Sequence, residues 1–408
     1  MTILAELRHR RHRDATDADA ATATPGSSGN LSPTDPLGLA ASRRRTIIWI
    51  LTLTAALLVS VIFSVGFGSV HVSPADSARV LSHHLFGTAL GLGSTGGTGD
   101  PGGTSTSDLA RHDAVIWTIR APRAALGVLV GAGLAIAGVI LQAVVRNVLA
   151  DPYVLGVSSG ASVGAAAAIT LGVGTGATAA LGNHALGDYA LQTSAFLGAL
   201  IASALVIGVA RTAGRFTATR LLMAGIAVGY ALSALTSFLV FASDSAESSR
   251  SVMFWLLGSL GLANWSGPLV AVAVVVAISI CILLLLGPRI DALNLGDETA
   301  LTLGINPDRL RLGLIVLSCL LVGAVVAMAG AIGFLGLVVP HLARRLVGGR
   351  HRALTPVAAL LGAVLLTWAD IGARTLLAPQ EIPVGIVTAL VGAPFLLLLV
   401  HRMHRRES

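Results

Sequence analysis

The chain has 408 residues, of which 54% are hydrophobic and only 12% are charged, whereas soluble domains carry about 25% charged residues. This composition excludes an ordinary water-soluble protein. The formal net charge is +7, and the chain contains arginine but no lysine. Because a phosphate-binding P-loop needs a lysine, the chain is not expected to hydrolyse ATP itself. The arginines gather at the ends of apolar segments, which is typical of membrane orientation and not of nucleic-acid binding.

Residues 1–42 form a polar segment with a run of arginine and histidine, RHRRHR, at residues 8–13. Alanine, threonine, aspartate, serine, glycine and proline dominate the rest, so this segment cannot bury enough apolar surface to fold. We therefore predict a disordered cytoplasmic tail over residues 1–42. Residues 43–408 are predicted to form one transmembrane domain.

Ten apolar segments follow the tail and predict an all-α polytopic membrane protein with about ten transmembrane helices. The eighth segment is short for a full crossing, which predicts a broken or tilted helix. The segments cover residues 46–66, 124–145, 157–176, 191–210, 220–242, 267–287, 312–330, 333–347, 354–371 and 383–401.

The loops between these segments differ in their arginine content, and this difference predicts the orientation. Most arginines fall on the side that also holds both termini, so that side is predicted to be cytoplasmic. The opposite side holds a Gly/Ser/Thr-rich loop at residues 91–107. It also holds several arginines that depart from the usual bias, namely Arg111, Arg120, Arg123, Arg250 and Arg374.

Several residues inside the apolar segments have both a chemical and a structural interpretation. Ser158 lies in GVSSG, which matches the G-x-S-x-G motif of hydrolases, but no alternating strand and helix pattern surrounds it. A tightly packed helix start is the preferred interpretation. His341 has no second histidine or carboxylate at metal-binding spacing and is interpreted as a helix-end residue. Cys281 and Cys319 lie in apolar runs, which favours packing over a disulfide or a metal site.

Asp370 and Arg374 are four residues apart and can pair on one helix face, with Glu381 shortly beyond them. Local pairing is therefore the expected role of Asp370. The position of Arg374 on the outer side leaves room for a docking role.

The loop over residues 291–311 reads DALNLGDETALTLGINPDRLR and predicts two short helices joined at Gly304. Asp297 and Glu298 would lie near the start of the first helix, where the helix dipole favours negative charge. An apolar face in this cytoplasmic loop predicts contact with a partner protein, and the residues of that face are Leu293, Leu295, Leu301 and Leu303.

Six motifs together resemble the FecCD family of ATP-binding-cassette (ABC) importer permeases, over residues 46–401. Their order and spacing make the resemblance specific. The motifs are IRAPRAALGVLVGAGLAIAGVILQ (119–142), RNVLADPYVLGVSSGAS (146–162), LNLGDETALTLG (293–304), GAIGFLGLVVPHLAR (330–344), ADIGAR (369–374) and EIPVGIVTALVGAPFLLLL (381–399).

The resemblance implies a type II ABC importer permease architecture over residues 43–408, in the cytoplasmic membrane. It implies two permease subunits around a central pathway, either identical copies or paralogues, and two separate ABC ATPase subunits. An extracytoplasmic substrate-binding protein would deliver an iron–siderophore chelate or a related cargo. No cofactor, metal site or catalytic residue is expected in this chain, and contact with membrane lipid but not with nucleic acid is expected.

The resemblance also assigns roles to individual residues. The segment that couples the permease to the ATPase would comprise Leu295, Gly296, Asp297, Glu298, Ala300, Leu303 and Gly304, with Asp297 where the family usually has glutamate. Three outward-facing arginines would meet acidic residues of the binding protein, and these are Arg120, Arg123 and Arg374. The inner gate would comprise Asn147, Leu149, Thr217, Ala218 and Thr219. Val148 stands where the family usually has proline.

Alternatives remain at this point. Permeases for haem and cobalamin share these motifs, so the cargo is open within the family. An ion-coupled secondary transporter would belong to another class, but it is expected to carry ionisable residues near the middle of the membrane, where this chain has few. A third alternative is an intramembrane hydrolase that uses Ser158.

Overall fold

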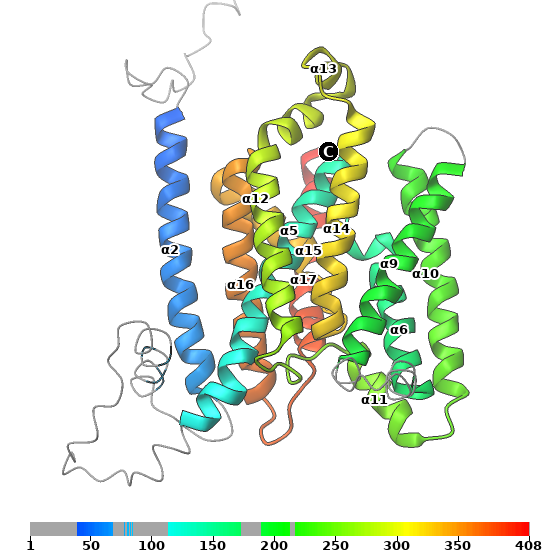
Figure 1. Cartoon of the computed structure of the whole chain (residues 1–408). Helices are drawn as coiled ribbons and strands as arrows, with labels where there is room; N and C mark the ends of the chain where they lie inside the picture. Colours follow the sequence, from blue (N-terminus) through cyan, green and yellow to red (C-terminus); the bar gives the residue numbers. More distant parts are fainter. Residues whose placement is uncertain are drawn as a thin grey trace, which may run out of the picture. The chain divides into compact units, whose positions relative to one another are not determined.

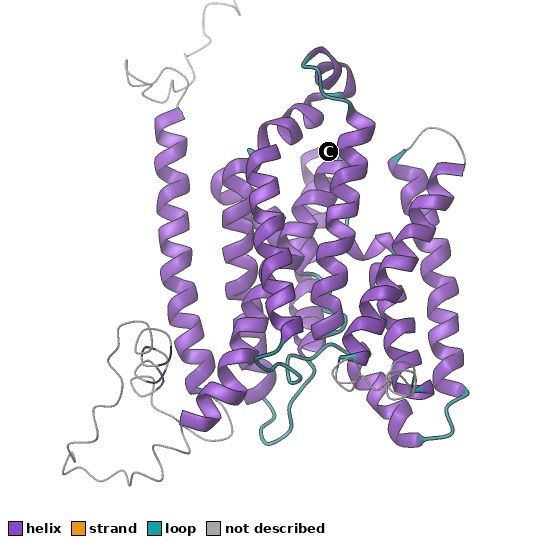
Figure 2. Cartoon of the chain, viewed as in Figure 1, coloured by secondary structure: helices purple, strands orange, loops and turns teal. Residues whose placement is uncertain are grey.

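A computed structural model of the chain describes residues 39–67, 113–172, 189–212 and 217–407, together with Ser77, Val80, Ser82 and His84. Nearly all of the predicted tail 1–42 and the whole loop 91–107 lie outside the described residues. The chain divides into two compact units, residues 1–47 and residues 48–408, and the arrangement below is that of the second unit. In the described residues the regular elements are helical and none is a strand (Figure 2).

Each of the ten predicted apolar segments coincides with a helix, which confirms the all-α polytopic fold. Seven of these helices are long and apolar enough to cross a membrane, whereas α6, α15 and the apolar part of α17 are shorter. The helices are α2 (Leu39–Gly66), α5 (Ala121–Val145), α6 (Val157–Leu171), α9 (Ala190–Thr212), α10 (Ala218–Phe241), α12 (Gly267–Leu295), α14 (Pro307–Ala329), α15 (Leu335–Val347), α16 (His351–Thr375) and α17 (Val384–Glu407).

Four shorter elements complete the described chain: the π-helical turn η2 (Ile116–Arg120), the 3-10 turn η3 (Pro152–Leu155), α11 (Ala246–Leu256) and α13 (Asp297–Thr302). Helix α11 was not predicted from the sequence, although Ser245 caps its first turn by accepting a hydrogen bond from the Ser248 amide at 3.3 Å. The sixth segment was predicted to end at residue 287, whereas α12 continues to Leu295 through Pro288.

Helices α13 and α11 lie at opposite ends of the helical bundle (Figure 1), and we call these the α13 end and the α11 end. The start of α14 and the turn after α5 lie at the α13 end. The start of α17 and the end of α14 lie at the α11 end, and α17 runs from there toward the α13 end. The two ends therefore carry different groups of predicted site residues.

Helix α5 is the centre of the bundle, because 83% of its spanning window is buried. It contacts α12, α14, α15 and α16. Two contacts are so close that only glycine fits: a Cβ atom on Gly131 would lie 2.3 Å from the Gly362 carbonyl oxygen of α16. One on Gly138 would lie 1.8 Å from the Gly336 carbonyl oxygen of α15. Small residues thus bring three helix backbones together, as is common between helices in lipid.

The short helix α15 follows a break in regular structure between α14 and α15. Gly330 and Phe334 have positive φ values of 68° and 70°, which end α14 and start α15. The Tyr153 hydroxyl, from η3, donates to the Ile332 carbonyl and accepts from the Ile332 amide, both at 2.9 Å. These bonds satisfy backbone groups that helix geometry leaves unpaired. Irregular backbone is tolerated inside a membrane protein where such partners exist. The eighth predicted segment, expected to be broken or tilted, is a short continuous helix that follows this break.

Candidate functional site

Helix α13 forms a short, rigid projection at the α13 end. Gly296 precedes it with φ 132° and Gly304 follows it with φ 73°. Residues other than glycine rarely adopt such positive φ values. Ala300 is fully buried and accepts a hydrogen bond from the Ile305 amide at 2.9 Å, which folds the exit of α13 back onto the helix. The prediction of two short helices is half right, because the second one is the start of α14 and not a separate helix.

The apolar face predicted for this segment exists, with one correction. Leu295, Leu301 and Leu303 expose 74%, 58% and 62% of their surface. Leu293 is instead fully buried at the end of α12, because that helix continues through it. Three exposed leucines around an anchored helix make an apolar surface that needs no rearrangement to meet a partner.

Asp297, the first residue of α13, is held by two arginines from different helices. The Arg146 guanidinium approaches one carboxylate oxygen at 2.5 Å. The Arg311 guanidinium contacts both oxygens, at 2.6 and 3.0 Å. The hydrogen bonds from Arg311 and then from Arg146 lower the pKa of Asp297, which lies in α13, outside the spanning helices. Glu298 beside it is exposed.

Arg146 ends α5 in the left-handed conformation, with φ 54°, and begins the predicted gate turn. A β-turn follows, closed by a 3.1 Å hydrogen bond from the Ala150 amide to the Asn147 carbonyl. The Asn147 side-chain oxygen accepts from the Leu149 amide at 2.9 Å. Val148 occupies the second turn position, where proline is favoured but not required. The turn therefore forms without the family's usual proline.

The second group of predicted gate residues lies at the start of α10. The Thr217 side chain caps this helix by accepting from the Arg220 amide at 3.4 Å. Ala218 is half-buried and Thr219 is exposed. Thr217 and Ala218 share one cavity of about 410 Å³ with the arginine–aspartate cluster, and Asn147, Leu149 and Thr219 do not line it. The lining residues are Val144, Val145, Arg146, Thr217, Ala218, Leu221, Asp297, Asp308 and Arg311.

Two of the three arginines that the resemblance assigns to docking have buried side chains at the α11 end. Arg120 and Arg374 expose 6% and 8% of their surface. Arg120 donates to the carbonyls of Val65 and Gly66, at 2.9 and 3.1 Å. Arg374 donates to the carbonyls of Ser64 and Phe67, at 3.0 and 2.9 Å.

The last carbonyl oxygens of a helix have no partner within the helix itself. The two guanidinium groups supply these partners from η2 and from α16. Basic side chains near a helix C-terminus also interact favourably with its dipole. Arg120 and Arg374 are therefore capping residues of α2. The sequence analysis missed this role, because the groups that the arginines satisfy belong to the backbone of a distant segment.

Arg123, the third of these arginines, joins two carboxylates. It contacts Asp370 at 3.0 Å and Glu381 at 2.9 Å. Asp370 is 2% exposed and also pairs with Arg374 at 3.0 Å, so the predicted local pairing is confirmed. Glu381 is the open edge of the cluster, with 54% of its side chain exposed.

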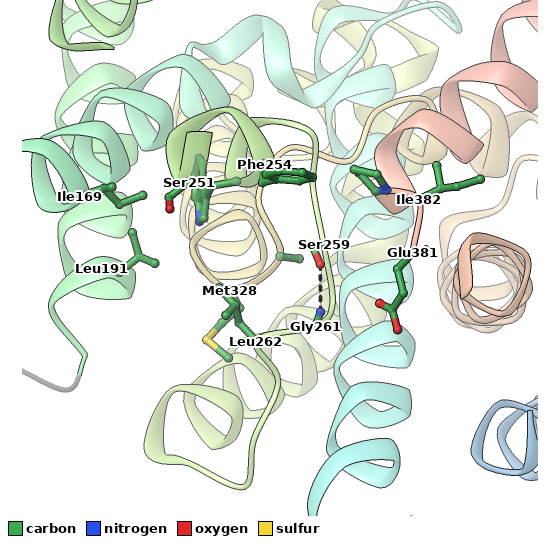
Figure 3. Close-up of a pocket in the computed structure, with 13 residues that line it drawn as sticks. Ile169, Leu191, Ser251, Phe254, Ser259, Gly261, Leu262, Met328, Glu381 and Ile382 are labelled. Atoms are coloured by element: carbon green, nitrogen blue, oxygen red, sulfur yellow. Dashed lines mark hydrogen bonds between the residues drawn. The ribbon is translucent and has the colours of Figure 1, made fainter. Parts of the chain in front are cut away.

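Glu381 also lines a cavity of about 630 Å³ at the α11 end, shown in Figure 3. The walls come from the end of α6, the start of α9, α11 and its following loop, the end of α14 and the segment before α17. Most of the lining is apolar, with Phe254, Leu262 and Met328 prominent, and Ser251 and Ser259 add hydroxyl groups. Such a wall can accommodate a large, partly apolar solute.

The other residues that had a possible chemical role in the sequence lie within helices. Ser158 lies in the first turn of α6, where its carbonyl accepts from the Ser162 hydroxyl at 2.9 Å. The His341 ring lies edge-on to Phe395, with 6.4 Å between ring centroids. Cys281 is exposed and Cys319 is buried. Among the described residues, no group of three or more histidine, cysteine or acidic side chains is arranged to hold a metal ion.

The sequence matches the FecCD transport family over residues 56–402. The hemin transport system permease protein HmuU of Yersinia pestis is 44% identical over 307 residues, covering 75% of this chain and 88% of the relative. The cobalamin import system permease protein BtuC of Halobacterium salinarum is 44% identical over 70% of this chain and 73% of the relative. The Fe(3+)-citrate import system permease protein YfmD of Bacillus subtilis is 37% identical, over 72% of this chain and 84% of the relative.

A solved structure described as an inward-facing conformation of a metal-chelate type ABC transporter is similar to this chain in three dimensions. Its TM-score is 0.70 at 33% identity, and the match covers 86% of this chain and 98% of the solved chain. The similarity therefore extends over nearly the whole of the solved chain and is not confined to one motif.

Replacing a capping arginine should destabilise the bundle. We expect Arg374→Gln to lower the melting temperature in detergent, because it removes the ion pair with buried Asp370 and the bonds to α2. Breaking one partner of a buried pair costs about 3–5 kcal/mol. Exposed Arg250 serves as the control, and Arg250→Gln should melt like the wild type. Equal melting temperatures for the two variants would contradict the capping role.

Proposed function

The chain belongs to the FecCD transport family of ABC-importer permeases, and we propose that its cargo is a ferric siderophore. It is a multi-span permease subunit of the cell membrane and not an enzyme. The named relatives are permeases for hemin, cobalamin and ferric citrate, which are all metal chelates. The largely apolar cavity of about 630 Å³ supports a bulky chelate as the cargo. Haem is the second candidate, favoured by the 44% identity to the hemin permease.

The observation that carries the mechanism is the anchored helix α13 with its exposed leucines. We propose that an ABC ATPase subunit receives Leu295, Leu301 and Leu303 in an apolar groove. ATP binding would close the ATPase pair and displace α13, and the attached spans would then open the pathway alternately to each side. Such coupling requires that the cargo and the nucleotide each bind the two states with different free energies. The remaining predicted coupling residues, Gly296, Glu298, Ala300 and Gly304, shape this projection.

The orientation in this proposal puts the α13 end in the cytoplasm, with both termini on that side. Arginine content supports it, since cytoplasmic ends of membrane proteins are enriched in basic residues. The helix ends that lie at the α13 end (Figure 1) carry Arg146, Arg211, Arg220, Arg289, Arg309, Arg311, Arg344, Arg345, Arg350 and Arg352. The described elements at the α11 end carry Arg120, Arg123, Arg250 and Arg374.

A second permease subunit, identical or paralogous, would complete the pathway. The exposed face of α10 supports this partner, because only 17% of its spanning window is buried. Tyr230, Phe238 and Phe241 expose 77%, 61% and 88% of their surface. Packing against a second bundle or against lipid would cover these aromatic side chains.

We propose that a substrate-binding protein docks at the α11 end through the charge cluster. Arg120, Arg123 and Arg374 carry three positive charges, and Asp370 and Glu381 carry two negative charges. The remaining single positive charge favours an acidic partner surface. Because Arg120 and Arg374 cap α2 and the Arg123 side chain is only 12% exposed, direct contact with the partner falls mainly to the exposed edge at Glu381, with Arg123 contributing its charge. Charges at such a rim mainly steer association and set orientation.

Transport should require the complete importer. We expect the chain, reconstituted in proteoliposomes with its ATPase and binding protein, to move a ferric hydroxamate only when the ATPase can hydrolyse ATP. Haem, cobalamin and ferric citrate are assayed in parallel, and an ATPase lacking its P-loop lysine is the control. Uptake without any hydrolysing subunit would contradict the function, and uptake of haem alone would replace the siderophore as cargo.

The exposed leucines of α13 should hold the ATPase. We expect the double variant Leu301→Ala, Leu303→Ala to lose co-purification of the ATPase while the permease still inserts and folds. Burying a leucine side chain contributes about 1.5 kcal/mol or more, so two losses should weaken binding at least about 100-fold. Leu285→Ala is the matched control, since Leu285 is 75% exposed on α12, away from α13. Persistent co-purification would count against this assignment.

The two charges at the docking edge should act in opposite directions. Arg123→Gln removes the net positive charge of the cluster and should weaken the affinity of the binding protein. Glu381→Gln adds to that charge and should strengthen the affinity. Both effects should shrink as salt rises, because exposed charges are screened. Titration of labelled binding protein at low and high salt measures this, and equal affinities at low salt would refute the docking site.

A further inference from the structure

We propose that the Asp297 carboxylate is a mechanical link between α13 and the inner gate, with Arg146 as the positioning residue that transmits the movement. The proposal rests on the proposed function, because it assumes that an ATPase displaces α13. The family resemblance assigned Asp297 to the ATPase contact. Its two arginine partners assign it instead to a connection inside this chain.

Three helices meet at this one carboxylate. Arg146, at the end of α5, contacts the carboxylate and also donates to the Leu293 carbonyl of α12 at 2.5 Å. Arg311, in the first turns of α14, contacts the same carboxylate. Asp308 lies 3.9 Å from Arg311 and adds a second negative charge, so two arginines and two aspartates form a neutral cluster. A displacement of α13 therefore pulls on α5 and α14 through short, charge-assisted bonds.

The connection continues from Arg146 into the gate turn through the backbone. Asn147 follows Arg146 directly, and the hydrogen bonds within Asn147–Ala150 make the turn a small rigid unit. Thr217 and Ala218, the other predicted gate residues, line the same cavity as Arg146 and Asp297. Movement at Asp297 thus reaches both gate segments without passing through the buried centre of the bundle.

The ion pair between Arg146 and Asp297 is too exposed to contribute much to folding stability. The side chains of Arg146 and Asp297 are 37% and 43% exposed. Ion pairs with this exposure contribute little to folding stability. Loss of Arg146 should therefore leave folding and ATPase binding intact and change the transmission of movement. A residue with a purely structural role would change stability first.

The test uses the full importer in proteoliposomes and measures two rates, ATP hydrolysis and cargo uptake. We expect Arg146→Gln and Asp297→Asn each to keep ATPase co-purification and hydrolysis but to lower uptake per ATP at least about fivefold. The double variant should lose no more than Asp297→Asn alone, since that variant already removes the bond to Arg146. Arg146→Lys and Asp297→Glu, which keep the charges, should recover part of the coupling. Arg309→Gln, an exposed arginine nearby, is the matched control.

The pH dependence adds an independent measurement. Because the pKa of Asp297 is lowered, its charged form is favoured in the folded protein, and the link is lost only when pH falls through that lowered value. Titration of Asp297 should therefore cause no change in the wild-type uptake per ATP between about pH 5.5 and pH 8. Asp297→Asn should be defective across the whole range.

Different outcomes overturn different statements. Unchanged uptake per ATP in Arg146→Gln, or additive losses in the double variant, would overturn the link. Loss of ATPase co-purification in Arg146→Gln would also overturn it, because the cluster would then belong to the ATPase contact. A wild-type importer whose uptake does not depend on ATP would instead overturn the proposed function and leave the contacts of Asp297 unaffected.

Discussion

Unpaired backbone groups cost free energy in a lipid environment, and this constraint organises the irregular parts of the structure. Tyr153 pairs the amide and carbonyl of Ile332 where the chain breaks between α14 and α15. Arg120 and Arg374 pair the last carbonyls of α2. In each case a side chain from a distant segment completes a helix end. The same hydrogen bonds hold η3 against the break between α14 and α15, and hold η2 and α16 against the end of α2.

The sequence was sufficient to predict the ten helical segments, because apolar runs of spanning length are typical of membrane helices and rare elsewhere. It was insufficient for α11, which mixes Glu247 and Arg250 with apolar residues and so lacks a hydropathy signal. The end of α12 was also misplaced, since the apolar run ends near residue 287 whereas the helix continues through Pro288 into a polar stretch as far as Leu295. Helix boundaries depend on tertiary packing, whereas the existence of a span depends mainly on composition.

The candidate site was predictable in part. Resemblance placed Asp297 in a coupling segment, and the structure adds that its partners lie 151 and 14 residues away in sequence, at Arg146 and Arg311. Pairing across such separations leaves no local pattern. The burial of Arg120 and Arg374 could not be read from the sequence for the same reason, because they bind carbonyl groups near residue 65. Thr217 and Ala218 were assigned to the gate by resemblance alone, and the cavity that they share with Asp297 became visible only in the fold.

The glycine contacts of α5 have a consequence for how such a bundle can change shape. Gly131 and Gly138 bring the α5 backbone against Gly362 and Gly336, with no side chain between them. Interdigitated backbones cannot slide along one another without first separating, so α5, α15 and α16 behave as a single block. Rearrangement then has to occur as tilting of whole helices around that block. Helix α10 has its main contacts with α6 and α9 and therefore lies outside that block.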